Sequence, residues 1–133
     1  MGNLFIKRAH LKEILTKVRG SKVEICGFLV GTIKGKDVFV EKVVFASNRL
    51  NSPVGFEIDP LETLKVLEAA EREGKEIVGI FHSHVNRPPY PSSKDLKGMD
   101  LWRNIWLIVN NLREYRAFIL EGGKVKEVKV EAV

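Results

Sequence analysis

The chain reads IVGIFHSH at residues 77–84, and this stretch predicts both a buried strand and a chemical site at its end. The apolar run from Ile77 to Phe81 has the length and composition of a strand. Side chains alternate along a strand, so His82 and His84 project to one face and Ser83 to the other. Two imidazoles on one face, in a chain with only three histidines, form half of a candidate metal site.

The other half lies downstream, where residues 92–95 read SSKD. Asp95 adds a carboxylate to the two histidines, and three protein ligands are the number that a catalytic zinc uses while its fourth position holds water. Ser92 and Asp95 also have the spacing of a helix capping box, with Ser92 as the N-cap of a short helix from Ser93 to about Met99. We expect the capping role to hold whatever else these residues do.

The segment between the two halves, VNRPPYP at residues 85–91, favours a metal site. Its three prolines stiffen the connection and reduce the entropy lost when Asp95 is held near the histidines. A His-x-His pair alone is equally typical of two surface histidines, and Pro-Pro-Tyr is also typical of ligands for proline-binding modules. Inside a compact domain we favour the stiff connection.

These residues resemble the signature of the JAMM (MPN-plus) metalloprotease family, which has HSH, seven residues and then S-x-x-D, as at residues 82–95 here. The family signature also has a glutamate on an early strand, and Glu24, in EICGFL, is similar to that element. The segment FEIDP at residues 56–60 is similar to family members as well, so the resemblance covers about residues 24–95. The chain departs from many members at Val85, which stands where they have proline.

The resemblance implies a zinc metallo-isopeptidase of the compact prokaryotic or archaeal type. In such an enzyme His82, His84 and Asp95 hold Zn²⁺, Glu24 is the general base without ligating the metal, and Ser92 donates its hydroxyl to the oxyanion. The implied reaction cleaves the peptide or isopeptide bond after the C-terminus of a ubiquitin-like modifier protein. The absence of large insertions favours a simple modifier.

Three other functions remain open from the sequence. The first is a peptidase that releases cysteine or another adduct from a ubiquitin-like sulfur carrier protein. The second is a non-catalytic scaffold of the MPN type, against which the intact ligand set argues. The third is a nucleic-acid protein with incidental zinc, which salt-dependent binding would reveal.

The periodicity of the whole chain predicts one α/β domain over residues 1–133, a mixed sheet flanked by helices. We expect a first helix whose buried stripe is Leu11, Ile14, Leu15 and Val18, and which ends before Gly20; His10 falls off this stripe and is expected to be exposed. The expected strands are Val23–Val30, Val38–Ala46, Ile77–Phe81, Trp106–Val109, Tyr115–Leu120 and Val125–Val130.

The middle helix is predicted from the residues at its two ends, with Asp59 as N-cap, Pro60 at its first position and Gly74 after its end. Leucines 61, 64 and 67 are expected to form its buried face.

Composition indicates an ordinary globular protein, with 44% hydrophobic and 29% charged residues. No apolar run approaches the ~20 residues that span a bilayer. Cys26 is the single cysteine, which cannot form an internal disulfide and suits a reducing cytoplasm, and we expect it to be a buried thiol. The formal charge of +5 is spread along the chain. We interpret its one cluster as a solvated helix face and expect no nucleic-acid partner; the cluster is Lys7, Arg8, Lys12, Lys17, Arg19 and Lys22.

Overall fold

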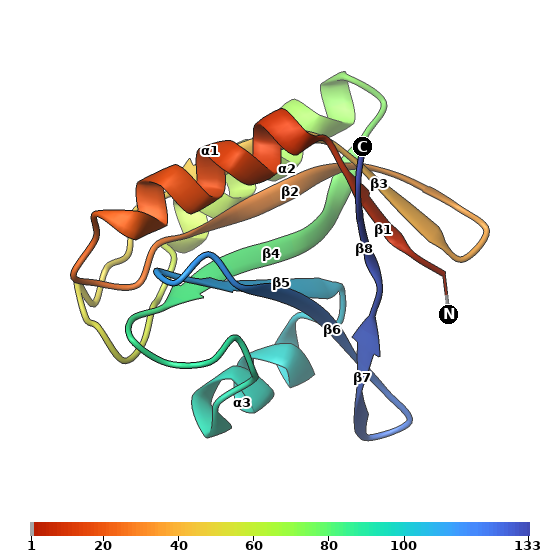
Figure 1. Ribbon diagram of the computed structural model, residues 1–133. Helices are drawn as coiled ribbons and strands as arrows, with labels where there is room; N and C mark the ends of the chain where they lie inside the picture. The colour runs from red at the N-terminus through yellow and green to blue at the C-terminus, as the bar shows by residue number, and fades with distance from the viewer. Residues whose placement is uncertain (1) are drawn as a thin grey trace.

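The computed structural model describes residues 2–133, whose eight strands and three helices confirm the expected α/β class. Figure 1 shows their arrangement. The strands are β1 (Leu4–Ile6), β2 (Cys26–Lys34), β3 (Asp37–Ala46), β4 (Glu76–His84), β5 (Ile105–Asn110), β6 (Tyr115–Glu121), β7 (Lys124–Val128) and β8 (Val130–Ala132). The helices are α1 (Arg8–Arg19), α2 (Pro60–Arg72) and α3 (Ser93–Leu101).

All eight strands belong to one mixed sheet in the order β7-β6-β5-β4-β2-β3-β1-β8. β4 lies in the middle, antiparallel to β2 and parallel to β5. A single residue, Lys129, separates β7 from β8 at the two ends of this order. The sheet therefore curls until its first and last strands are joined through that residue.

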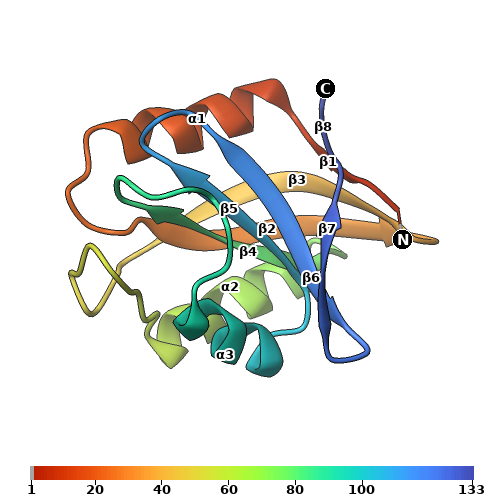
Figure 2. The same cartoon turned by 60° about the horizontal axis from the view of Figure 1, so that its bottom comes forward.

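Helices cover both faces of the sheet, and Figure 2 shows α1 on one side with α2 and α3 on the other. The predicted stripe of α1 is buried and packs on a cluster that includes Leu29, Phe81 and Leu107. On the opposite face a second cluster, including Ile80 and Trp106, packs against α2 and α3. Because Phe81 faces α1, the strand alternation turns His82 toward α2 and α3.

The buried face predicted for α2 is wrong. Leu61, Leu64 and Leu67 are 68%, 48% and 38% exposed, whereas Ala70 is buried and Val66 packs against the second core cluster. Both sets have helical spacing, so periodicity alone cannot separate them. The smaller side chains face the sheet, where they let the helix approach closely.

The ends of α2 are as predicted. Asp59 accepts a hydrogen bond from the backbone N–H of Leu61 (2.9 Å), and Pro60 occupies the first helical position. Gly74 follows the helix with a φ of +70°, in the left-handed region that glycine adopts without strain.

Some elements differ from the expectation. The short strand β1 was not predicted, and the expected strand Val125–Val130 is divided into β7 and the start of β8. His10 is a helix residue as expected but is partly buried rather than exposed. Among residues 2–133, no helix combines the length and apolar character needed to cross a membrane.

Candidate metal and catalytic site

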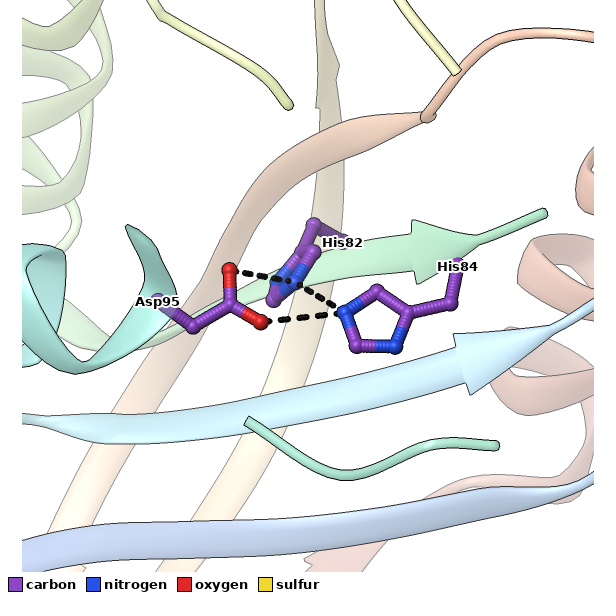
Figure 3. Close-up of side chains that lie close together, drawn as sticks. All are labelled: His82, His84 and Asp95. Carbon is purple, nitrogen blue, oxygen red and sulfur yellow. Dashed lines mark hydrogen bonds and ion pairs between the residues drawn. The ribbon is translucent and has the colours of Figure 1, made fainter. Parts of the chain in front are cut away.

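Three side chains converge at the end of β4 and the start of α3 (Figure 3). The Nε2 atoms of His82 and His84 lie 3.3 Å apart. Asp95 Oδ1 lies 3.1 Å from His82 Nε2, and Asp95 Oδ2 lies 3.0 Å from His84 Nε2. All three side chains are buried. The structure thus brings together the three predicted ligands as a group able to hold a metal ion.

The strand geometry of β4 accounts for the two histidines. His82 pairs with Cys26 of β2 and with Ile108 of β5, so it lies in a central, well-fixed part of the sheet. Ser83 projects to the other face, as predicted, and its hydroxyl accepts a hydrogen bond from the backbone N–H of Ile25 (2.7 Å). That bond anchors the segment before β2 to the strand that carries the histidines.

A capping box aims the carboxylate of Asp95, and this confirms the predicted cap. Ser92 Oγ accepts from the Asp95 N–H (3.1 Å), while Asp95 Oδ2 accepts from the Ser92 N–H (2.9 Å). The same Oδ2 faces His84. The first turn of α3 therefore fixes the rotamer of Asp95, the third candidate ligand, so one local motif serves both the helix and the candidate site.

The proline loop fixes the tautomer of His84. Its Nδ1 lies 2.8 Å from the carbonyl oxygen of Pro88, which can only accept, so Nδ1 carries the proton. In the neutral ring Nε2 is then a bare lone pair that faces the Asp95 carboxylate. Two acceptors at 3.0 Å repel each other unless a cation lies between them. The donor set is therefore one that fits a metal ion.

The electrostatics of the cluster favour the forms that bind a metal. Complete burial lowers the pKa of His82, which keeps its imidazole neutral. Burial acts to raise the pKa of Asp95, but the two imidazole rings of His82 and His84 beside its carboxylate outweigh it and hold that pKa well below its usual range. A neutral imidazole at His82 and an ionised carboxylate at Asp95 are the states that coordinate a cation.

Spacing provides a second test of the fit. Two nitrogens bound at ~2.0–2.1 Å to a tetrahedral zinc lie about 3.3–3.4 Å apart. The two Nε2 atoms are 3.3 Å apart. The residues present fit an ion of that size.

Aromatic side chains line one side of the cluster. The Phe56 ring stacks on His82 with centroids 4.7 Å apart, and Trp106 meets the same imidazole edge-on at 5.6 Å. A cavity of about 290 Å³ opens beside Asp95, between α3 and the segment 50–58. Phe56, Trp102 and Trp106 contribute to its wall, so the cavity that adjoins Asp95 is largely apolar.

Glu24 lies just before β2 rather than within the strand predicted for Val23–Val30. Its N–H donates to the carbonyl of Ser52 (2.9 Å) and its own carbonyl accepts from the amide of Asn48 (3.0 Å), so loop residues replace the strand pairing. The side chain is only 2% exposed. Burial raises the pKa of Glu24 to about 7, and the nearby Arg87 acts in the opposite direction.

Residues that the sequence reasoning passed over complete the surroundings of the site. Arg87 donates to Glu24 Oε2 (2.7 Å), and the buried Asn110 donates to the Arg87 carbonyl (3.0 Å). Neither belongs to a motif, and only the position of Arg87 inside the proline loop could have drawn attention to it. Cys26 is the buried thiol that was expected, and burial raises its pKa to about 12, so it stays protonated.

Comparisons with known proteins agree with this geometry. A family model for prokaryotic homologs of the JAB domain matches residues 7–120. A desampylase from Pyrococcus furiosus is 56% identical over 128 residues, which cover 96% of this chain and 89% of that protein. A CysO-cysteine peptidase from Mycobacterium bovis is 32% identical over 114 residues, 83% of this chain and 77% of that protein.

Among solved structures, the solution structure of protein DSY2949 from Desulfitobacterium hafniense superposes with a TM-score of 0.84 at 27% identity, covering 98% of this chain and 92% of that one. The similarity therefore extends over the whole sheet and its helices. The predicted resemblance to the JAMM type is confirmed, and the chain belongs to the family of prokaryotic JAB-domain homologs.

Proposed function

We propose that this protein is a zinc-dependent peptidase that cleaves the bond after the C-terminus of a ubiquitin-like modifier. The observation that carries the proposal is the meeting of His82, His84 and Asp95 around one point, with the His84 lone pair turned toward the carboxylate. Two nitrogens and one oxygen are a ligand set typical of catalytic zinc, which keeps a fourth position open. Membership of the family of prokaryotic JAB-domain homologs also supports a metal-dependent peptidase.

When bound, zinc would supply a Lewis acid that lowers the pKa of a water to about 7 and polarises the scissile carbonyl. The three ligand side chains need no rearrangement to hold it, because strand β4 and the capping box already fix them. Phe56 and Trp106 exclude water from the far side of His82. Such a low-polarity wall strengthens electrostatic interactions at the reacting atoms.

Glu24 is the proposed general base. Its Oε1 is buried and has no hydrogen-bond partner among the described residues, so this atom is available to accept a proton from the attacking water. The same oxygen then delivers the proton to the leaving amine. A pKa near 7, raised by burial, suits a group that must both take and give a proton at neutral pH.

Ser92 is the proposed oxyanion donor. Its hydroxyl oxygen accepts from the Asp95 N–H, and this leaves the hydroxyl proton free to be donated. A donor aimed at charge that develops in the transition state is typically worth 10²–10³ in kcat. Capping and catalysis therefore use different parts of one hydroxyl group.

The substrate is proposed from the relatives and from the shape of the approach. The Pyrococcus relative is named a desampylase, and the chain shares more than half of its residues with it. A flexible modifier tail can enter as an extended segment, and the apolar cavity beside Asp95 offers it a path to the ligands. The leaving group is a lysine side chain of the modified protein.

A second candidate is the release of cysteine from a ubiquitin-like sulfur carrier, as the name of the mycobacterial relative suggests. The modifier side of the scissile bond is the same in both reactions. A non-catalytic scaffold is less well supported, because such a role requires none of the buried ligands. We expect the protein to act in the cytoplasm, where a lone buried thiol needs no oxidised partner.

One experiment separates these functions. The protein is incubated with a ubiquitin-like modifier joined to a lysine side chain, and in parallel with the same modifier joined to cysteine, with zinc or with chelator. Mass spectrometry of the new C-terminus should show zinc-dependent release at the modifier's last residue, faster for the lysine conjugate. Faster release of cysteine would establish the second candidate, and no release from either substrate would refute both.

A further inference from the structure

Within residues 2–133, one hydrogen bond holds the carboxylate of Glu24, and its donor is Arg87. The guanidinium nitrogen Nη2 lies 2.7 Å from Glu24 Oε2, with the Arg87 side chain 35% and the Glu24 side chain 2% exposed. The other oxygen, Oε1, has no partner among residues 2–133. One end of the carboxylate is thus tethered while the other is free.

The loop that carries Arg87 is fixed from two sides. Asn110, at the end of β5, donates to the Arg87 carbonyl (3.0 Å), and its Oδ1 accepts from the N–H groups of Leu112 and Glu114. On the other side, the Pro88 carbonyl accepts from His84 Nδ1 (2.8 Å). The same short segment therefore contacts a predicted metal ligand and the predicted base.

Asn86 adds a third tether beside Arg87. Its backbone N–H donates to Asn111 Oδ1 (2.8 Å), and the Asn111 amide donates to Asn86 Oδ1 (2.7 Å). The backbone of Asn86 has a φ of +56°, in the left-handed region. With its backbone fixed in this way, the Arg87 side chain needs little further ordering to meet Glu24.

We propose that Arg87 is the positioning residue of the general base: it binds Glu24 Oε2 and so directs Oε1 at the reacting water. This inference rests on the proposed function and deepens it. A buried carboxylate without a countercharge is costly, and it would turn toward any donor within reach. The guanidinium offers that donor at one oxygen and leaves the second for proton transfer.

The same contact has one alternative role, an inhibitory one, in which Arg87 prevents Glu24 from accepting a proton. The unpartnered Oε1 favours the positioning role, because an inhibitory contact would occupy the oxygen that accepts the proton. The two roles predict changes in kcat of opposite sign when the contact is removed.

The test uses the chain of residues 1–133 with bound zinc and one lysine-linked modifier conjugate. Arg87→Met should bind zinc at the wild-type stoichiometry and keep KM within about twofold, while kcat falls about 10–100-fold, as when other orienting partners are removed. Arg87→Lys should recover part of the loss, since an ammonium can reach one oxygen. The control is Arg103→Met, which removes an exposed arginine paired with Asp100 at 2.6 Å outside the site, and it should retain the wild-type kcat.

A double-mutant cycle with Glu24→Gln adds a readout independent of turnover. In the zinc-free protein, the denaturant midpoints of Arg87→Met and Glu24→Gln should be non-additive, because both changes abolish the same ion pair. In the Glu24→Gln background, Arg87→Met should change kcat no further.

The results that overturn the inference differ from those that overturn the function. Full or raised kcat in Arg87→Met, or additive effects throughout the cycle, would refute the role of Arg87 in an active enzyme. A wild-type protein that cleaves no conjugate would refute the proposed function itself. Should Arg87→Met fail to fold, Arg87→Lys carries the same comparison, and its kcat must then lie below the wild-type value with KM unchanged.

Discussion

Removal of the Ser92 hydroxyl should have two separable effects, one on stability and one on catalysis. Ser92→Ala loses the side-chain acceptor for the Asp95 N–H (3.1 Å), while the reciprocal bond from the Ser92 N–H to Asp95 Oδ2 is a backbone donation and survives. Loss of an N-cap side chain costs about 1 kcal/mol, or roughly 4 °C in Tm for a domain of this size. Loss of one oxyanion donor lowers kcat roughly 10²–10³-fold, about 2.7–4 kcal/mol of transition-state stabilisation.

The assay measures urea unfolding, zinc stoichiometry, kcat and KM on one modifier conjugate. Ser93→Ala is the matched control, because Ser93 is the exposed neighbouring serine and should change none of these quantities. Ser92→Thr keeps a hydroxyl at the cap and should therefore retain most of the wild-type stability and most of the wild-type kcat. KM should stay close to the wild-type value, since the donor acts mainly on charge that develops in the transition state.

Two results would refute this reasoning. Wild-type kcat in Ser92→Ala would mean that another group stabilises the oxyanion. Loss of zinc together with kcat would mean that the hydroxyl matters only because its cap holds Asp95 in place.

Three further predictions follow from the geometry. Glu24→Gln should retain zinc and substrate binding while kcat collapses, because the amide cannot accept the water's proton; full activity would place the base elsewhere. Because burial raises the pKa of Glu24 from 4.5 to about 7, the zinc-free folded state binds more protons than the unfolded one between these values. Its free energy of unfolding should therefore fall by up to about 3 kcal/mol as pH rises from below 4.5 to above 7, and a urea titration of Glu24→Gln should lack that component. Gly98→Ala should lower the stability by about 1–3 kcal/mol despite a better helix former, because the new Cβ would lie 2.5 Å from the ring of the buried Trp106; an unchanged Tm would show that α3 shifts freely.

The sequence predicted best those features of the site that depend on the spacing of residues a few positions apart. Alternation along a strand placed His82 and His84 together, and the Ser92–Asp95 spacing predicted the helix cap. The carboxylate expected from the following helix lies beside the two histidines. These inferences need only local geometry, which a few consecutive residues determine.

The errors arose where distant partners decide the outcome. Leu61, Leu64 and Leu67 have the same helical spacing as the face of α2 that packs on the sheet, and nothing local separates the two faces. Glu24 does not lie in a strand. Its backbone is held by hydrogen bonds with Ser52 and Asn48, and the next residue, Ile25, is held by Ser83.

The side-chain contacts that surround the candidate ligands and base could not be predicted from the sequence either. Arg87 reaches a glutamate 63 positions away in sequence, and Asn110 reaches back to Arg87 across 23 positions. A single sequence contains no signal for such pairings, because each side chain is an ordinary polar residue in its own segment.

The capping box would link the lifetime of an ion bound at His82, His84 and Asp95 to local opening of the N-terminal end of α3. Helix termini open locally far more often than a protein unfolds as a whole, and opening here would release the Asp95 N–H and swing its carboxylate away from both histidines. Fraying of α3 and escape of the metal would then be one event, and occupancy would in turn hold the first turn of the helix closed. Hydrogen exchange at a single amide, that of Asp95, should then be slower in the metal-bound protein than in the metal-free one.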